Sequence, residues 1–207
     1  MSVVIIGAGH SGVAAATALR KLDKDIKITL ISNEDNLPYQ RPPLSKKTVF
    51  SETPSSDLIL GKDFYNKNDI NLHTNSAVDK INPEKSSIIL FSKDIIEYEQ
   101  LIIATGTKRH ELKIPGEDLA KTLYSIKDAQ NLSKSIAKAK KIKLGSPMDK
   151  DTQMGPLNSF KQLENIEKNI KATVEQGGKI RCGGKRSSIS NKGYYFPATI
   201  IECKNHN

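Results

Sequence analysis

The first dozen residues constrain the fold more than any other stretch of this chain. An apolar, β-branched run over residues 2–6 leads directly into the glycine-rich turn GAGHSG at residues 7–12, and a run of helix-forming residues follows. This order predicts a strand, a tight turn and a helix, with the pattern G-x-G-x-x-G in the turn. The pattern favours a dinucleotide-binding site, and a plain strand-to-helix turn without a ligand is the alternative.

Each glycine of the turn has its own physical task. Gly7 permits a turn that a side chain would block, Gly9 lets the backbone approach a pyrophosphate, and Gly12 lets the helix lie close to the strand. The start of the helix directs unpaired N–H groups and the positive end of its dipole at the phosphates.

A second strand is predicted over residues 26–31, which alternate and are rich in β-branched side chains. It completes a β-α-β unit, so the two strands should be parallel. In dinucleotide folds an acidic residue about 20 positions after the glycines binds the ribose hydroxyls. Glu34, just after this strand, is the leading candidate and Asn33 the second, while a solvated loop of turn-forming residues is the alternative.

The rest of the first 140 residues predicts short strands. Residues 70–72 form one, and the apolar run 101–104 is typical of a parallel sheet. That run ends at Thr105 and Gly106, where the backbone can approach a cofactor. A small antiparallel meander is predicted from three further runs, at residues 77–81, 87–91 and 95–98.

The composition argues against several function classes. The formal net charge is +9, but the basic residues are scattered and aromatic residues make up only 5%, so no nucleic-acid partner is predicted. No apolar stretch is long enough to cross a bilayer, and no membrane partner is predicted. Cys182 and Cys203 lie far apart and the four histidines do not cluster with them, so we predict no metal site. We expect a cytoplasmic chain.

Four motifs of the first half resemble one family. They are residues 3–12, LPYQRPPLSK at 37–46, LIIATG at 101–106 and IPG at 114–116. Together they resemble the N-terminal FAD domain of the ferredoxin, putidaredoxin and rubredoxin reductases, a branch of the pyridine nucleotide-disulfide oxidoreductase superfamily. The resemblance implies FAD at the glycine turn, NAD(P) as a second cofactor of the family, and an iron-sulfur electron carrier as partner.

The resemblance also implies roles for single residues. Val78 would lie near the adenine, Arg41 and Lys46 near the flavin, and the segment after residue 104 beside the pyrophosphate. The predicted cofactor-binding residues are Gly7, Gly9, Ser11, Gly12, Asn33, Glu34, Arg41, Lys46, Val78, Thr105 and Gly106, with no catalytic residue. The chain departs from the family twice, with Asn33 in the acidic ribose position and Tyr124 where many relatives carry an arginine. We therefore expect a weak or incomplete FAD site.

The pattern changes after a predicted helix at residues 128–141. The second glycine motif of the reductases is absent, and a loop over 143–157 follows instead. Asn158 or Ser159 caps a helix that ends at the glycine pair 177–178. The apolar face of this helix is formed by Phe160, Leu163, Ile166, Ile170 and Val174. A short strand at 179–182, a turn at 183–186 and an extended run at 194–201 complete the prediction.

This second half resembles a different family, the NAD(P)-dependent aldehyde dehydrogenases. The matching motifs are GSPMDKDTQMGPL at 145–157, GGKIRCGGKR at 177–186 and GYYFPATII at 193–201. The resemblance implies an internal segment of the catalytic domain, and the catalytic residues of the family lie outside it. Cys182 occupies an ordinary strand position without a base motif, which favours a structural cysteine over a nucleophile.

The fold class predicted is therefore α/β, with two parts. Residues 1–141 form a Rossmann-like FAD-binding domain with a three-stranded antiparallel meander, and residues 142–207 form an incomplete α/β fragment of an aldehyde dehydrogenase. The leading hypothesis for function is a ferredoxin-reductase-like FAD protein, truncated and fused to this fragment. The alternatives are an inactive chimeric or pseudogene product and, disfavoured because the catalytic residues are absent, NAD-dependent aldehyde oxidation.

Overall fold

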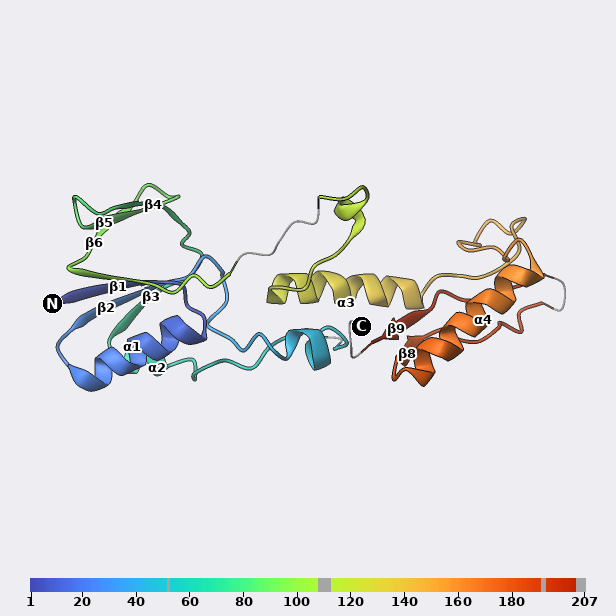
Figure 1. Ribbon diagram of the computed structural model, residues 1–207, viewed down its shortest axis with the longest axis horizontal. Helices are drawn as coiled ribbons and strands as arrows, with labels where there is room; N and C mark the ends of the chain where they lie inside the picture. Colours follow the sequence, from blue (N-terminus) through green and yellow to red (C-terminus); the bar gives the residue numbers. More distant parts are fainter. Residues whose placement is uncertain (52, 108–112, 191–192, 204–207) are drawn as a thin grey trace. The chain divides into compact units, whose positions relative to one another are not determined.

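The computed structural model describes residues 1–51, 53–107, 113–190 and 193–203 (Figure 1). The chain divides into two compact units, Met1–Ala129 and Gln130–Asn207. The division falls within helix α3 (Ile126–Lys140), upstream of the boundary that the sequence suggests after residue 141. Each unit is described by itself.

The first unit is built on a parallel sheet of four strands. They are β1 (Ser2–Ile6), β2 (Lys27–Ile31), β3 (Ile70–His73) and β7 (Gln100–Ile103), in the order β3-β2-β1-β7. Helix α1 (His10–Leu22) connects β1 to β2, and this pair is parallel as predicted. Because every neighbouring pair is parallel, the carboxyl ends of all four strands lie along one edge, with the end of β1 between those of β2 and β7.

Two layers cover the faces of this sheet. Helices α1 and α2 (Phe64–Lys67) lie on one face, and an antiparallel sheet lies over the other (Figure 1). Successive side chains of a strand point to opposite faces. Val3 and Ile5 accordingly pack in the helix-side cluster, and Val4 and Ile6 pack with Ile88 in the other. The antiparallel sheet is the predicted meander, in the order β4 (Val78–Asn82), β5 (Ser87–Leu90) and β6 (Ile95–Glu97).

Helix α3 begins two residues earlier than predicted because a reciprocal cap fixes its start. The Ser125 hydroxyl accepts a hydrogen bond from the Asp128 amide at 3.2 Å, and the Asp128 carboxylate accepts one from the Ser125 amide at 2.8 Å. Ile126 and Ala129 are buried beside Tyr39 and Leu44. Leu44 opens a short π-helix, η1 (Leu44–Thr48), which follows the two prolines at 42–43, and a 3-10 turn, η2 (Glu117–Leu119), precedes α3.

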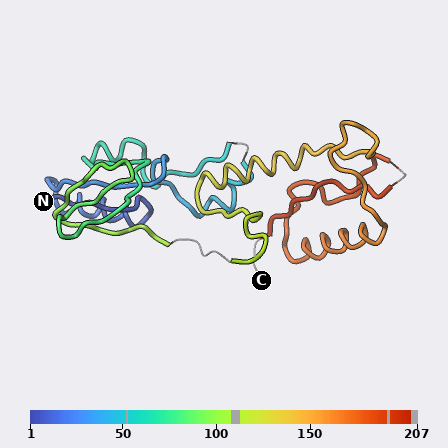
Figure 2. Tube along the Cα trace, turned by 90° about the horizontal axis from the view of Figure 1, so that it is seen from above, coloured from blue at the N-terminus to red at the C-terminus, as the bar shows by residue number. Residues whose placement is uncertain are grey.

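The second unit contains helix α4 (Phe160–Glu175) and an antiparallel pair, β8 (Lys179–Cys182) and β9 (Ile200–Glu202) (Figure 2). Of the two candidate caps, Ser159 is the one used, because its hydroxyl accepts a hydrogen bond from the Gln162 amide at 3.2 Å. In the extended run predicted at 194–201, Tyr194 pairs with Leu157 in an isolated antiparallel bridge, and a regular strand begins at Ile200. Pro197, between them, has no N–H to donate to a neighbouring strand.

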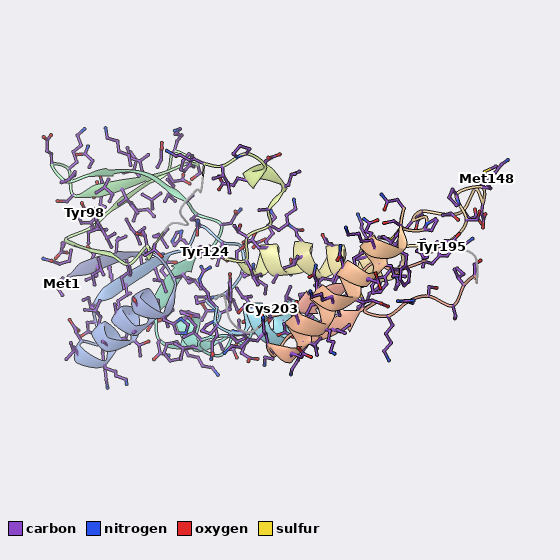
Figure 3. The ribbon with its side chains drawn as sticks, turned by 45° about the vertical axis from the view of Figure 1, so that its right-hand side comes forward. Met1, Tyr98, Tyr124, Met148, Tyr195 and Cys203 are labelled. Atoms are coloured by element: carbon purple, nitrogen blue, oxygen red, sulfur yellow. The ribbon has the colours of Figure 1, made fainter. Side chains whose placement is uncertain are left out.

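The second unit buries fewer apolar side chains than the first. Among the described residues its buried hydrophobic members are Ile136, Leu163, Tyr195 and Phe196. Met148, in the loop before α4, is 91% exposed (Figure 3). Across both units, no helix within the described ranges combines the length and the apolar character that a membrane crossing requires.

Candidate functional site

The glycine turn joins β1 to α1 at the carboxyl edge of the parallel sheet. Gly7 has a φ of 106°, and a Cβ added there would lie 2.3 Å from the carbonyl oxygen of Ala104. A Cβ at Gly12 would lie 1.8 Å from the carbonyl oxygen of Gly7. Both distances are far inside van der Waals contact, so these two glycines are required by the packing of strand, turn and helix.

Gly9 differs from its neighbours because it borders open space. A Cβ built on Gly9 would meet no heavy atom of the described chain within 4 Å, and its φ of −78° suits any residue. Gly9 is the N-cap of α1; among the residues that the structure describes, no side chain bonds to the cap, and the first turn has no acidic residue. The amides at the start of α1 therefore face the opening without a competing side-chain acceptor, which suits an anionic group.

A cleft of about 360 Å³ lies over this turn. It is bordered by segments that follow three neighbouring strands, namely β1, β2 and β7. Its lining includes Gly7, Ala8, Gly9, His10, Ser11, Ser32, Asn33, Glu34, Tyr39, Arg41, Thr105, Gly106, Thr107 and Tyr124. The arrangement follows the general rule that ligands of open α/β sheets bind outside the carboxyl ends of the strands.

A second cavity, of about 710 Å³, adjoins the cleft and shares Gly7, Asn33 and Thr105 with it. Its remaining lining comes from the parallel sheet and from the meander, and most of those side chains are apolar. They include Ile6, Ile31, Val78, Ile81, Phe91 and Ile103. An apolar cavity with a few polar groups suits an aromatic heterocycle. The two cavities together offer an apolar space for a base and, at the turn, backbone amides that suit phosphates.

Glu34, the leading sequence candidate for the ribose contact, is occupied by two neighbours. Its Oε2 accepts a hydrogen bond from the Tyr39 hydroxyl at 2.5 Å, and its Oε1 accepts one from the Arg41 guanidinium. Asn33, the second candidate, is exposed and borders both the cleft and the adjoining cavity. Burial, reinforced by the hydrogen bond to Glu34, raises the pKa of Tyr39 to about 12, so its hydroxyl stays a donor at neutral pH.

Tyr124, labelled in Figure 3, contacts both Arg41 and Thr107 at the cleft. Its carbonyl oxygen accepts a hydrogen bond from Arg41 Nη1 at 2.8 Å, and its ring centroid lies 4.7 Å from the guanidinium carbon. The Tyr124 hydroxyl donates to the carbonyl oxygen of Thr107 at 2.8 Å. The sequence marked Tyr124 only as a departure from a family pattern. Its contact with Arg41 spans 83 positions of the chain, so no local pattern could reveal it.

The structure brings most of the predicted cofactor-binding residues to these two cavities. Gly12 packs behind the turn, and Val78 lines the apolar cavity. Lys46 is exposed on η1 and does not belong to the described lining of either cavity. Residues that line the cleft are Gly7, Gly9, Ser11, Asn33, Glu34, Arg41, Thr105 and Gly106.

Two further groups of residues bear on the chemistry. Within the ranges that the structure describes, no three His, Cys, Asp or Glu side chains gather as a metal ion would require. In the second unit, the Cys182 thiol lies on β8 and donates to the carbonyl oxygen of Ala198 at 3.5 Å. Cys203 is exposed.

Comparison with protein families divides the chain as its motifs do. Residues 1–146 match the pyridine nucleotide-disulphide oxidoreductase family, and residues 124–207 match the aldehyde dehydrogenase family. The matches overlap over residues 124–146, a stretch that contains α3.

Individual relatives and solved structures agree with the first match. The chain is 37% identical over 142 residues to rubredoxin-NAD(+) reductase of Pseudomonas putida, covering 67% of this chain and 37% of the relative. A ferredoxin reductase from Rhodopseudomonas palustris superposes with a TM-score of 0.61 at 33% identity, over 66% of this chain and 34% of that one. The covalent complex of putidaredoxin reductase with putidaredoxin matches with a TM-score of 0.59 at 27% identity, over 69% and 35%. The chain spans about a third of the length of the curated relatives it matches.

Proposed function

Because the chain belongs to the pyridine nucleotide-disulphide oxidoreductase family, we propose that its first unit binds FAD as part of a ferredoxin-reductase-like electron-transfer protein. The observation that carries the proposal is the start of α1. Its amides open on the cleft without a side-chain cap, and Gly9 leaves room for a phosphate against the backbone.

Different residues would contact different sections of the proposed cofactor. The pyrophosphate would lie over Gly7–Ser11 and beside Thr105 and Gly106, where amides supply hydrogen-bond donors. The adenine would occupy the apolar cavity with Val78, and Asn33 would contact the ribose between them. Arg41 then stands on the flavin side of the phosphates. Lys46, exposed on η1, lines neither cavity and is given no contact in this proposal.

The proposed activity is electron transfer between NAD(P)H and an iron-sulfur carrier. FAD, when bound, would supply the ability to exchange electrons with both kinds of partner. The names of the relatives support this choice, since they include a rubredoxin reductase and a structure of a reductase joined to putidaredoxin. The residues of this chain would hold and orient the cofactor; none of them is assigned a catalytic step. Neither a nucleic acid nor a membrane is part of the proposal.

For the second unit we propose no aldehyde-oxidising chemistry of its own. Cys182 lies on β8, where it pairs with Ile200 of β9, and its thiol contacts the carbonyl oxygen of Ala198; this position suits a structural thiol. The overlap of two unrelated family matches around α3 supports the alternative that the chain is a fusion without selected activity. An aldehyde dehydrogenase activity is the weakest candidate. NAD reduction above the blank rate with a simple aldehyde would contradict that ranking.

A fluorescence titration tests the FAD proposal directly. Purified full-length protein is added to FAD, and the expected result is saturable quenching of flavin fluorescence that excess ADP reverses. The matched control is Glu84→Gln, which alters an exposed carboxylate in a turn of the meander. Absence of quenching at high micromolar protein would overturn the proposal.

A further inference from the structure

A continuous bridge of four residues crosses the carboxyl edge of the parallel sheet. It starts at Glu34, which follows β2, passes through Arg41 to Tyr124, and ends at Thr107, which follows β7. In the sheet order, β1 lies between β2 and β7. The bridge therefore passes over the end of β1, where the glycine turn lies.

The bridge also forms one wall of the cleft. All four of its members line that cleft, and none of them lines the apolar cavity on the other side of the turn. A ligand that enters the apolar cavity with its base would place its adenosine away from the bridge and its phosphates at the turn, beneath the bridge. The second half of a dinucleotide would then have to pass the bridge.

Arg41 is the member whose position decides whether the bridge is intact. Its guanidinium is bonded to the Glu34 carboxylate and to the Tyr124 carbonyl, and it lies over two aromatic rings. The ring centroids are 5.4 Å away for Tyr39 and 4.7 Å away for Tyr124. Glu34 is only 20% exposed, so solvent screens this ion pair less than it screens a surface pair.

We propose that Glu34 and Tyr124 determine which nucleotides the cleft accepts, by holding Arg41 across it. With the bridge intact, the cleft takes adenine nucleotides that end at the β-phosphate, and it takes FAD only at the expense of the contacts of Arg41. The inference rests on the proposed nucleotide site and adds its specificity. Under this inference, the Glu34 carboxylate binds Arg41 and does not bind the ribose of the nucleotide.

Calorimetric titration of full-length protein with ADP and with FAD separates the possibilities. Two variants weaken the bridge: Glu34→Gln removes the charge of the ion pair, and Tyr124→Leu removes the ring over Arg41. In both we expect FAD to bind about fivefold more tightly while ADP affinity stays within about twofold of the unaltered chain. Tyr124→Phe keeps the ring and serves as the matched comparison, with a smaller gain for FAD.

Each other outcome has a definite meaning. A loss of ADP affinity in Glu34→Gln would overturn the inference, because it would place Glu34 on the ribose. Equal changes for ADP and FAD in Tyr124→Leu would also overturn it, since the bridge would then not discriminate between them. If no variant binds either nucleotide, the proposed function fails, and the inference with it. Circular dichroism melts of each variant check that the fold is retained.

Discussion

Gly12 of α1 lies directly against Gly7 of the preceding turn, and a single methyl group on Gly12 would stand 1.8 Å from the Gly7 carbonyl oxygen. The obstacle is backbone, which cannot rotate away as a flexible side chain could. Gly12→Ala should therefore lower the free energy of unfolding of the first unit by about 3 kcal/mol, at the upper end of the usual cost of overpacking. Urea unfolding followed by circular dichroism measures this change. An unchanged midpoint would show that α1 can shift without cost.

Gly9→Ala, unlike Gly12→Ala, should keep the stability of the first unit and lose affinity for FAD. The added methyl meets no described atom within 4 Å, and the backbone conformation of Gly9 suits alanine, so the unfolding midpoint should stay the same or rise slightly. The methyl would occupy the space assigned to the pyrophosphate, and we expect FAD affinity to fall by about tenfold or more. Paired unfolding and FAD titrations of Gly9→Ala and Gly12→Ala give the comparison. If Gly9→Ala keeps its full affinity for FAD, the phosphates do not bind at this turn.

Tyr39 and Tyr65 should ionise only well above the ordinary pKa of a tyrosine. Burial raises the pKa of both to about 12, and the hydrogen bond to Glu34 adds to the shift at Tyr39. Because both folded-state pKa values lie above the ordinary value of 10.0, their contribution to stability is complete below pH 10 and is lost as the pH rises toward 12. The absorbance of tyrosinate near 295 nm is measured as the pH is raised, and unfolding is measured in parallel. Two tyrosines should ionise late in this titration, at the pH at which the first unit unfolds. Tyr39→Phe should leave one.

The second unit should be cleaved before the first in limited proteolysis. Among the described residues it contributes four buried hydrophobic side chains, against nineteen in the first unit. Leu163 is only 2% exposed, and Leu163→Ala should cost about 2–5 kcal/mol and speed cleavage further. Lys171→Ala, at an exposed position of the same helix, is the matched control. Mass spectrometry of the fragments locates the cuts, and early cleavage within 1–51 would contradict the expectation.

Local patterns determined a large part of this structure. The β1-turn-α1-β2 unit, the meander and α4 follow from the period of apolar residues and from glycines at fixed spacing, because each rests on contacts between near neighbours in the chain. The spacing of Gly7, Gly9 and Gly12 likewise indicated both a fold and a nucleotide site. The two resemblances, to reductases over the first part and to aldehyde dehydrogenases over the second, were also present in the sequence motifs and agree with the family matches.

Tertiary structure alone decided which side chains meet at the candidate site. The sequence ranked Glu34 above Asn33 for the ribose, but the fold brings Arg41 and Tyr39 onto the Glu34 carboxylate and leaves Asn33 exposed at the cavities. It also joins Arg41 to Tyr124 across 83 positions. Such contacts depend on the order in which parallel strands assemble and on which loops then meet at their ends. The period of apolar residues indicates only which side of a helix or strand is buried. The hydrogen-bond or ion-pair partner of each polar side chain is determined only when the sheet forms and its loops meet.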